Sequence, residues 1–521
     1  MPELSSEKSH TVKAYLKNGF IFRDKACTIL HSVKPDFKFP NDIIIPSSTI
    51  EVEDRALDNL SGTYNSITFP ASISVMPPYL FTKRNVDIKT LILKDGFQII
   101  SDAVFRSAPF VKVILPDTLT EIGREAFKGC ENLEDINLEH IKKIGKEAFA
   151  ESGLKKVKLS SNIEDTEGFI FDKCNKLEEA EVNCACNMDY AFSSCKTLKK
   201  VTFGEHVKKI YHGMFSFCKS LETVNIPSNI KTIGKEAFRN SGLTSITVPG
   251  TCKLVEGIAF NGCKNLEEII FENGVEMIGR SVIGFTSVTS VTIPKSVYKI
   301  APLAFANAKK LKEIKLETLS TVIPNSFAIH CTDLEKINFE NIKSISENAF
   351  QDTAFTSLKL GNIKVKAYAF AECSKLKEIY LEDRCIVAPE AFVCCNNVEL
   401  VCVDNLFGKM SFMFGSDYKS YRGLYKKEEQ KFNKDMKIVI SKSVPLSDSK
   451  DFLEEYKDLT KNYFLPDLNI SSKYTLKEKA KIINFFNQNK SIEEITAELS
   501  ESSFSFREIS KIITEITRLR S

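Results

Sequence analysis

The sequence has few of the residues, and none of the motifs, from which most enzyme active sites are built. It contains no tryptophan and six histidines, and none of these belongs to a His-Glu-x-x-His or Cys/His metal motif. It also lacks a Gly-rich loop ending in Lys-Ser/Thr, which would bind phosphate, and a Gly-x-Ser-x-Gly turn, which would expose a catalytic serine. We therefore expect a protein that is not an enzyme and that uses no cofactor and no small-molecule substrate.

Charge and hydropathy argue against further classes. The 71 basic and 68 acidic residues leave a net charge of +3, which does not favour nucleic acid or an anionic membrane as a partner. No run of about 18 apolar residues is present, the first ten residues are polar, and the C-terminus lacks a prenylation motif. We expect no membrane span, secretory signal or lipid anchor. This predicts a cytoplasmic location, with the cell surface, reached by unconventional export, as the alternative.

The sequence does contain a repeat of 20 to 24 residues that covers most of the chain. A column of aromatic residues marks the repeat, with Ile283 in place of one aromatic, and Phe81 and Leu57 continue the column upstream. Its other members are Phe105, Phe127, Phe149, Phe171, Phe192, Phe215, Phe238, Phe260, Phe305, Phe327, Phe350, Phe370 and Phe392. This regularity predicts a solenoid of about sixteen stacked units.

Each unit reads as a strand followed by a return segment. Residues 311–316 alternate apolar and polar side chains, which predicts a strand with one buried face. The pair Ile233-Gly234 predicts a turn where backbone passes close to backbone, and Glu-Ala-Phe at 236–238 predicts a short helical turn. A single unit buries too little apolar surface to be stable, so the units must stack. Stacking would join the strands into one continuous parallel sheet.

These repeats resemble the BspA-like leucine-rich repeat family, whose units read roughly Leu-x-x-Ile-x-Ile-Pro, Ile-Gly and Ala-Phe-x-x-Cys in that order. The resemblance covers about residues 41 to 403. It implies a right-handed leucine-rich-repeat solenoid used for protein recognition, often in adhesion at the surface of bacteria and parasitic protists, and it implies no enzymatic activity. The predicted fold class is thus an α/β repeat, a leucine-rich-repeat solenoid with a continuous parallel β-sheet, plus a small C-terminal all-α module.

The predicted domains follow from where the repeat begins and ends. Residues 1–40 are assigned to an N-terminal cap, 41–404 to the solenoid, 405–445 to a C-terminal cap and linker, and 446–521 to a helical module. Apolar residues at helical spacing and capping patterns such as Ser491 to Glu494 predict four helices in this module. The helices faintly resemble a helix-turn-helix, which leaves a nucleic-acid-binding adaptor as a remote alternative.

Seven of the fifteen cysteines follow the aromatic column by three positions, at a place that small residues take in other units: Cys130, Cys174, Cys195, Cys218, Cys263, Cys373 and Cys395. Cys331 follows it by four. The pattern predicts a column of buried thiols, and together with the absent signal it favours a reducing compartment. The pair Cys184 and Cys186 stands partly outside the column, with a spacing that matches no common zinc motif. We expect no metal site.

The strand alternation identifies the side chains that point to solvent and could bind a partner. They are Lys156, Lys158, Glu179, Glu181, Lys200, Thr202, Thr223, Asn225, Glu268, Glu313, Lys315, Lys336, Asn338, Glu378 and Tyr380, together with Ser245, Thr247, Ile270, Ser290 and Thr292. The same charges could instead support the sheet as cross-strand pairs. We expect a protein partner on this face and a role as an interaction scaffold, with a BspA-like surface adhesin as the alternative.

Overall fold

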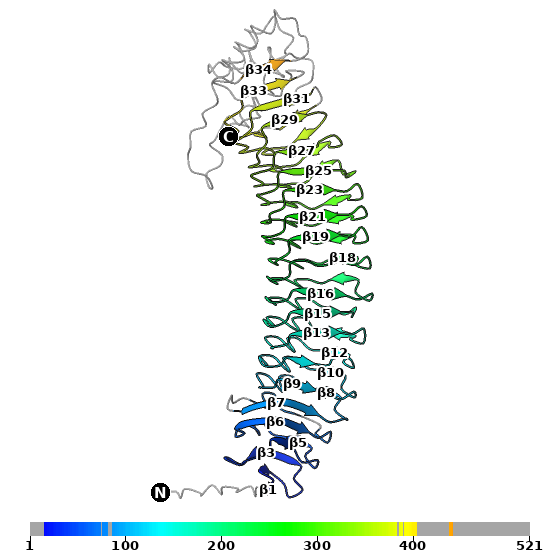
Figure 1. Ribbon diagram of the computed structural model, residues 1–521. Helices are drawn as coiled ribbons and strands as arrows, with labels where there is room; N and C mark the ends of the chain where they lie inside the picture. The colour runs from blue at the N-terminus through cyan, green and yellow to red at the C-terminus, as the bar shows by residue number, and fades with distance from the viewer. Residues whose placement is uncertain are drawn as a thin grey trace, which may run out of the picture. The chain divides into compact units, whose positions relative to one another are not determined.

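The computed structural model describes residues 15–73, 76–81, 86–382, 385–388, 390–403 and 437–440. The chain divides into two compact parts, each much longer than a single repeat. We call them unit 1, Met1–Leu311 with Lys315–Leu319, and unit 2, Lys312–Ile314 with Ser320–Ser521. The predicted helical module at 446–521 lies outside the described residues, so its helices stay predictions. Each unit is built from coils of the predicted length (Figure 1).

The predicted row of parallel strands is confirmed in unit 1. It contains β4 (Asp42–Ile44), β6 (Gly62–Phe69), β7 (Val86–Leu93), β9 (Lys112–Ile114), β11 (Asp135–Ile136), β13 (Lys156–Leu159), β15 (Glu179–Val182), β16 (Lys200–Phe203), β19 (Ser245–Val248), β21 (Glu268–Phe271) and β23 (Ser290–Ile293). We call this the first row. The prediction of one continuous sheet is wrong, because β4 to β11, β13 to β16, and β19 with β21 form separate sheets.

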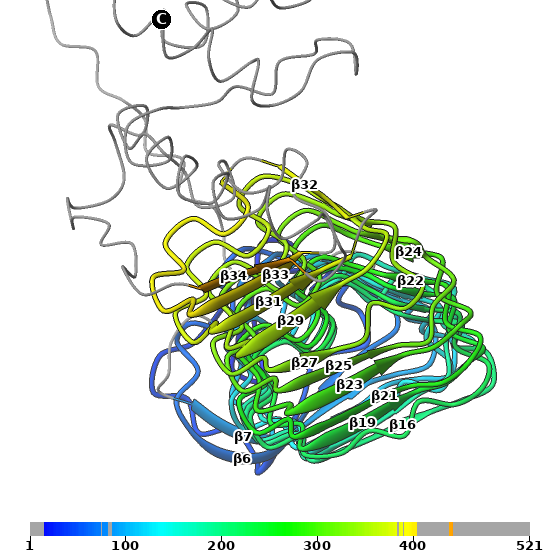
Figure 2. The same cartoon turned by 90° about the horizontal axis from the view of Figure 1, so that it is seen from above.

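A second row of parallel strands runs along unit 1 where the Ile-Gly pattern predicted only a turn. Each strand has two residues: β8 (Ile99–Ile100), β10 (Glu121–Ile122), β12 (Lys143–Ile144), β14 (Asp165–Thr166), β17 (Lys209–Ile210), β18 (Thr232–Ile233), β20 (Leu254–Val255), β22 (Met277–Ile278) and β24 (Lys299–Ile300). Figure 2 shows β22 and β24 on a different side of the coil from β19 and β21. A glycine directly follows β10, β12, β18 and β22, and it allows close approach there, since a Cβ on Gly145 would lie 2.5 Å from the backbone nitrogen of Arg124.

The predicted helical turns are wrong, and the described residues contain no helix. In Glu-Ala-Phe the glutamate has a positive φ, 52° at Glu125 and 58° at Glu147, which a right-handed helix cannot include. The amide of Phe127 instead donates to the carbonyl of Ala148 in the next coil, at 2.7 Å. These bonds between coils replace the bonds within a helix. The described part of the solenoid is therefore a β-solenoid and not an α/β repeat.

The aromatic column forms the centre of the core. The rings of Phe127, Phe149 and Phe171 stack with centroids 5.4 and 5.5 Å apart, and all three are fully buried. The prediction is wrong at Phe327, because the amide of Ala328 makes the column's bond, to the Ala349 carbonyl at 2.8 Å. Phe327 enters the core from one position earlier and meets Phe350 edge-on. Cys331 thus follows its column residue, Ala328, by three positions, as other column cysteines do.

The buried thiol column is confirmed. The thiol of Cys130 donates to the carbonyl of Phe105 at 3.0 Å, and that of Cys263 donates to the carbonyl of Phe238 at 2.9 Å. Fourteen cysteines of the described residues form no disulfide. Burial raises the pKa of Cys130 to about 12 and that of Cys263 to about 11, so both are neutral thiols at physiological pH.

Other strands lie at the ends of the described chain. In unit 1, β1 (Tyr15–Lys17), β2 (Phe20–Phe22) and β3 (Ile29–Val33) pair antiparallel within the predicted N-terminal cap, and β3 pairs parallel with β5 (Glu51–Val52). Unit 2 contains β26 (Val322–Ile323), β27 (Lys336–Ile337), β28 (Ser344–Ile345), β29 (Ser357–Leu360), β30 (Lys364–Val365), β31 (Glu378–Leu381), β32 (Ile386–Val387) and β33 (Leu400–Val403). The last of these pairs in parallel with β34 (Lys437–Ile440), which falls in the segment predicted as the C-terminal cap and linker. The boundary between the units falls within β25 (Glu313–Leu316).

Candidate protein-binding surface

The first-row strands of unit 1 present the predicted side chains to solvent. Val157 and Leu159 of β13 are buried, so the alternating Lys156 and Lys158 are exposed. The parallel register places Lys156 beside Glu179 and Lys158 beside Glu181. The next strand, β16, continues these two lines with Lys200 and Thr202, which are also exposed. The structure thus brings six predicted residues together on three neighbouring strands.

Four of these six side chains pair with one another. The Lys156 ammonium lies 3.1 Å from a Glu179 carboxylate oxygen, and the Lys158 ammonium lies 3.8 Å from a Glu181 oxygen. Both pairs are largely exposed, so each contributes about 0–1 kcal/mol to stability. The pairs favour the view that cross-strand charges support the sheet here. A partner that covered this area would have to remove water from charges that are already compensated.

Further along the same face lies an area without charge pairs, which we call the hydroxyl strip: Ser245, Thr247, Ile270, Ser290 and Thr292. All five side chains are exposed, on β19, β21 and β23. Ile270 stands beside Thr247 in the register and is 45% exposed. Glu268 lies next to Ser245 at one edge of the strip and is exposed. An exposed isoleucine among uncharged hydroxyls is the most apolar part of this stretch of the face.

Thr223 and Asn225 are exposed as predicted, but the strand predicted for them does not form. The peptide groups of residues 223–226 make no backbone hydrogen bond to a neighbouring coil, so no ladder is completed there. Val224 and Ile226 are still buried, with 8% and 6% exposure. The alternation of the sequence therefore correctly predicts which side chains face inward, although the hydrogen bonds of a strand are missing.

The remaining predicted residues do not gather into one site. In unit 2, Glu313 and Lys336 are adjacent in the register and exposed, while Asn338 is half-buried. Also in unit 2, the half-buried Tyr380 donates its hydroxyl hydrogen to Glu378 at 3.0 Å, so both are engaged within the chain. In unit 1, Lys315 pairs with Glu317 at 2.6 Å. These residues are separated along the sequence from the hydroxyl strip.

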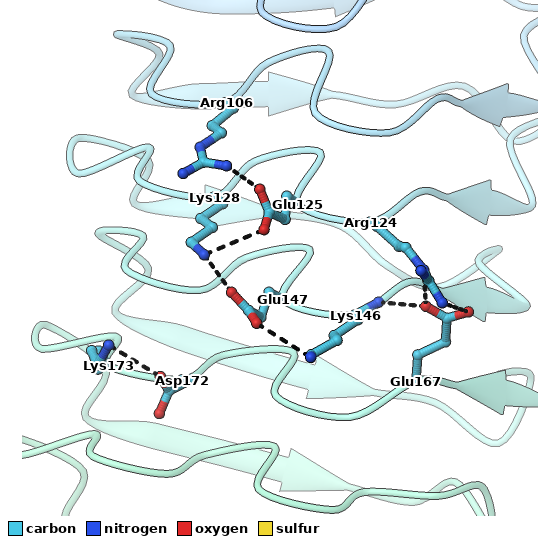
Figure 3. Close-up of polar contacts among 9 residues, drawn as sticks. All are labelled: Arg106, Arg124, Glu125, Lys128, Lys146, Glu147, Glu167, Asp172 and Lys173. Carbon is cyan, nitrogen blue, oxygen red and sulfur yellow. Dashed lines mark hydrogen bonds and ion pairs between the residues drawn. The ribbon is translucent and has the colours of Figure 1, made fainter.

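A network of charges on the turn segments was not predicted. Figure 3 shows Arg106 and Lys128 on either side of Glu125, and Glu147 between Lys128 and Lys146. A second group joins Arg124 to Glu167, with nitrogen and oxygen 2.6 Å apart. The sequence signal for this network is present but easily missed: Glu and Lys recur at fixed offsets from the aromatic column, one coil apart.

Hydrogen bonds in this network change the pKa values of Lys128, Glu147 and Glu167. The hydrogen bond from Lys128 lowers the pKa of Glu147 and the bond from Arg124 lowers that of Glu167, while the bond to Glu147 raises the pKa of Lys128. All of these shifts hold the groups in their charged forms at neutral pH. Because every charge already has a partner of opposite sign, the network joins consecutive coils and leaves no free charge in it to recruit a ligand.

The described part of the chain has few side-chain groupings that could bind a metal or take part in a reaction. No group of three or more His, Cys, Asp or Glu residues is placed there to hold a metal ion. The described residues also include no helix of the length and hydropathy that a membrane span needs. The surface that geometry leaves as the best candidate is therefore the first-row face, and within it the hydroxyl strip.

Parallel coils of this length around an aromatic and thiol core define a leucine-rich-repeat solenoid. The family model described as "BspA type Leucine rich repeat region" matches the chain in six copies, over residues 37–108, 98–188, 187–312 and 299–414. The chain belongs to this family. The predicted family resemblance is thereby confirmed.

Three of the solved structures that are similar to the chain are bacterial. A leucine-rich repeat protein of Bacteroides ovatus is 18% identical with a TM-score of 0.47, covering 82% of this chain and 98% of that one. One from Eubacterium ventriosum is 21% identical with a TM-score of 0.36, covering 59% and 82%. A leucine rich cell surface protein of Faecalibacterium prausnitzii is 20% identical with a TM-score of 0.31, covering 79% and 100%. No curated protein matches the chain.

Proposed function

We propose that this protein is a non-enzymatic interaction scaffold and that it binds a protein partner on the first-row face of unit 1, centred on Ile270. Proteins of the BspA-type repeat family are generally interaction or adhesion scaffolds. The single observation that carries the proposal for this chain is the 45% exposure of Ile270 within a strip of hydroxyl side chains.

Desolvation favours the hydroxyl strip over the charged strands beside it. Covering Ile270 removes apolar surface from water, which contributes about 25 cal/mol per Å² buried. The hydroxyls of Thr247 and Thr292 exchange water for partner groups at little net cost, because neutral hydrogen bonds are nearly balanced between the two states. The ion pairs of Lys156 and Lys158 offer no such gain.

A pair of matched variants tests this site. Ile270→Glu places a charge at the centre of the strip, and Ile114→Glu makes the same change on β9, at a side chain that is 43% exposed on the same face. Full-length wild type and both variants are used as baits in a native lysate. The proposal requires a partner that wild type and Ile114→Glu retain and that Ile270→Glu loses. Equal recovery by all three baits would move the site away from the strip.

We propose further that the protein acts in a reducing compartment. The support is chemical: the column thiols are buried and donate to backbone carbonyls, an arrangement that oxidation would disrupt. Labelling of intact cells with a membrane-impermeant amine reagent tests this location, with protection of the chain as the expected result. Labelling, together with capture of surface or matrix proteins through Ile270, would instead establish the adhesin alternative. A nucleic-acid-binding role would require salt-dependent DNA binding by the full chain.

A further inference from the structure

A line of isoleucines crosses the first-row face of unit 1 at its first four strands. Ile44 of β4, Ile92 of β7 and Ile114 of β9 lie on one line of the parallel register, with Thr68 of β6 between the first two. Ile44 is 69% exposed, Ile114 is 43% exposed and Ile92 is half-buried. We call these four residues the isoleucine line. Its strands are neighbours in one sheet, and Figure 1 shows β6, β7 and β9 following one another.

The side chains of the isoleucine line point away from the core. The alternate side chains of the same strands, such as Ile43, Ile67 and Val113, fill the core and are at most 3% exposed. The outer face of a sheet that meets water is usually polar. Here three of the four strands place an isoleucine on it at the same register position. A contiguous apolar patch of this kind marks an interaction site.

A second line on these strands carries opposite charges at its two ends. Two residues before the isoleucine line, the register places Asp42, Ser66, Thr90 and Lys112 side by side. Asp42 and Lys112 are exposed, and the Ser66 hydroxyl donates to Asp42 at 2.6 Å. Lys112 is in no ion pair among the described residues, although Asp135 of β11 stands next to it in the register. We call these four residues, Asp42 to Lys112, the charge line.

We propose that two copies of this chain associate face to face through these two lines. The two-fold axis lies between the two sheets, parallel to the strands and level with the boundary between β6 and β7. Such an axis reverses the order of the strands but keeps the position along each strand, so β4 of one copy faces β9 of the other. Ile44 then meets Ile114 of the partner subunit. Each such contact occurs twice, as an isologous interface requires.

The charge line selects this arrangement. The same axis sets Asp42 against Lys112 of the partner subunit at both ends of the interface, so opposite charges meet and no like charges of this line face each other. A two-fold axis along the stack of strands would instead set β4 against β4 of the other copy, and the pairing of opposite charges would be lost. The order of residues along both lines therefore makes this part of the face complementary to itself.

The area of the contact predicts a weak dimer. Four strands about 4.8 Å apart, with side chains two residues apart along each strand, give a strip roughly 20 Å long and about 10 Å wide. A stable interface buries about 800 Å² of surface on each partner, which is more than the two lines provide. The dimer therefore forms and dissociates with protein concentration, and the loss of one apolar contact shifts it strongly.

Sedimentation equilibrium of the full chain over a range of protein concentrations tests the proposal. We expect wild type to pass from monomer to dimer as the concentration rises. Ile44→Glu should weaken dimerisation at least tenfold, because it buries a charge against Ile114 of the partner subunit. The matched control is Ile270→Glu, the same change at a 45% exposed side chain outside the two lines, and it should dimerise as wild type does.

Charge reversal tests the two-fold arrangement itself. Asp42→Lys and Lys112→Asp each set like charges against each other, so each variant should be monomeric at concentrations where wild type is dimeric. Mixed in equal amounts, the two variants should form a dimer again, because the two lysines of one copy then face the two aspartates of the other. Circular dichroism of each variant checks that it is folded.

Two results would overturn the proposal. One is a wild type that stays monomeric at every concentration, which would leave the isoleucine line to a different protein. The other is a dimer that Ile44→Glu leaves intact, or that mixing the two charge variants fails to restore, which would place the contact elsewhere. Capture of a protein partner through Ile270 is a separate measurement, so failure of the hydroxyl strip as a binding site and failure of the dimer can be told apart.

Discussion

The rings of Phe127 and Phe149 lie 5.4 Å apart with 1° between their planes. Two side chains 22 residues apart in sequence are thus repeated almost without rotation, and both are fully buried. Such stacking shows that consecutive coils superpose closely in this part of unit 1. It also makes each ring part of the packing of two neighbours, so that loss of one ring is felt on both sides.

Truncation of a stacked ring should therefore be severe. We expect Phe149→Ala to lower the free energy of unfolding by about 3–5 kcal/mol, because it removes a buried ring and leaves a cavity between two others. Phe285→Ala is the control, since Phe285 is 51% exposed. Urea unfolding followed by circular dichroism measures both. Similar losses in the two variants would mean that the column does not carry the stability assigned to it.

A second prediction concerns the strained turns. Ser107 has a φ of 58°, while Gly129 and Gly262, with φ of 71° and 74°, take the same place two residues after the column phenylalanine in their coils. We expect Ser107→Gly to stabilise the protein by about 0.5–1 kcal/mol, since glycine tolerates this conformation and Ser107 is exposed. Ser107→Ala keeps the Cβ and should change little. A shift in urea midpoint that is equal for both variants would show that strain is not the cause.

Acid should weaken the network of Figure 3. The pKa of Glu147 is lowered from 4.5 by the Lys128 hydrogen bond, so its contribution is complete well above pH 4.5 and is lost as the pH falls through the lowered value. We expect Glu147→Gln to be less stable than wild type at pH 7, by on the order of 1 kcal/mol, and the difference to close as the pH falls through the lowered pKa of Glu147. Urea midpoints at several pH values test this.

The control for the acid effect is Glu164→Gln. Glu164 pairs with Lys142 at 3.2 Å, but its side chain is 63% exposed, so solvent screens the pair. We expect the stability of this variant to follow that of wild type across the pH range. A gap between Glu147→Gln and wild type that stays constant from pH 7 to pH 3 would show that packing, and not the charge of Glu147, accounts for the loss.

The columns could be predicted from the sequence because burial imposes one residue type at one period. The burial of Phe149 and Cys263 could be predicted from the spacing alone, without knowledge of the backbone. The position of Phe327 could not be predicted in this way, because alanine and phenylalanine exchange places there and only the amide bond of Ala328 reveals the register. Spacing alone assumes that the largest apolar side chain occupies the column.

The prediction of helical turns was wrong, and the second row was not predicted, for a different reason. Glu-Ala-Phe has good local helix propensity, but bonds such as that from Phe127 to Ala148 connect coils and override it. Strands of two residues, such as β12, are too short to show an alternation. The candidate site shows the same difference between features that depend on spacing and features that depend on contacts between coils. Exposure of Ile270 was predictable from period two, whereas the pairing of Lys158 with Glu181 depends on how neighbouring coils align.

The last prediction concerns the thiol column. It tests whether the hydrogen bond of a column cysteine or the volume of its side chain accounts for stability. The Cys218 thiol is fully buried and donates to the Phe192 carbonyl at 3.1 Å. Serine already occupies this column at Ser152 and Ser241, so Cys218→Ser should fold with nearly unchanged stability. Cys218→Val keeps the volume but leaves that carbonyl without its donor, which costs about 1–3 kcal/mol. Urea unfolding of the two variants decides between the roles. If valine were tolerated as well as serine, the column would be a matter of size alone and the thiol bonds would contribute nothing measurable.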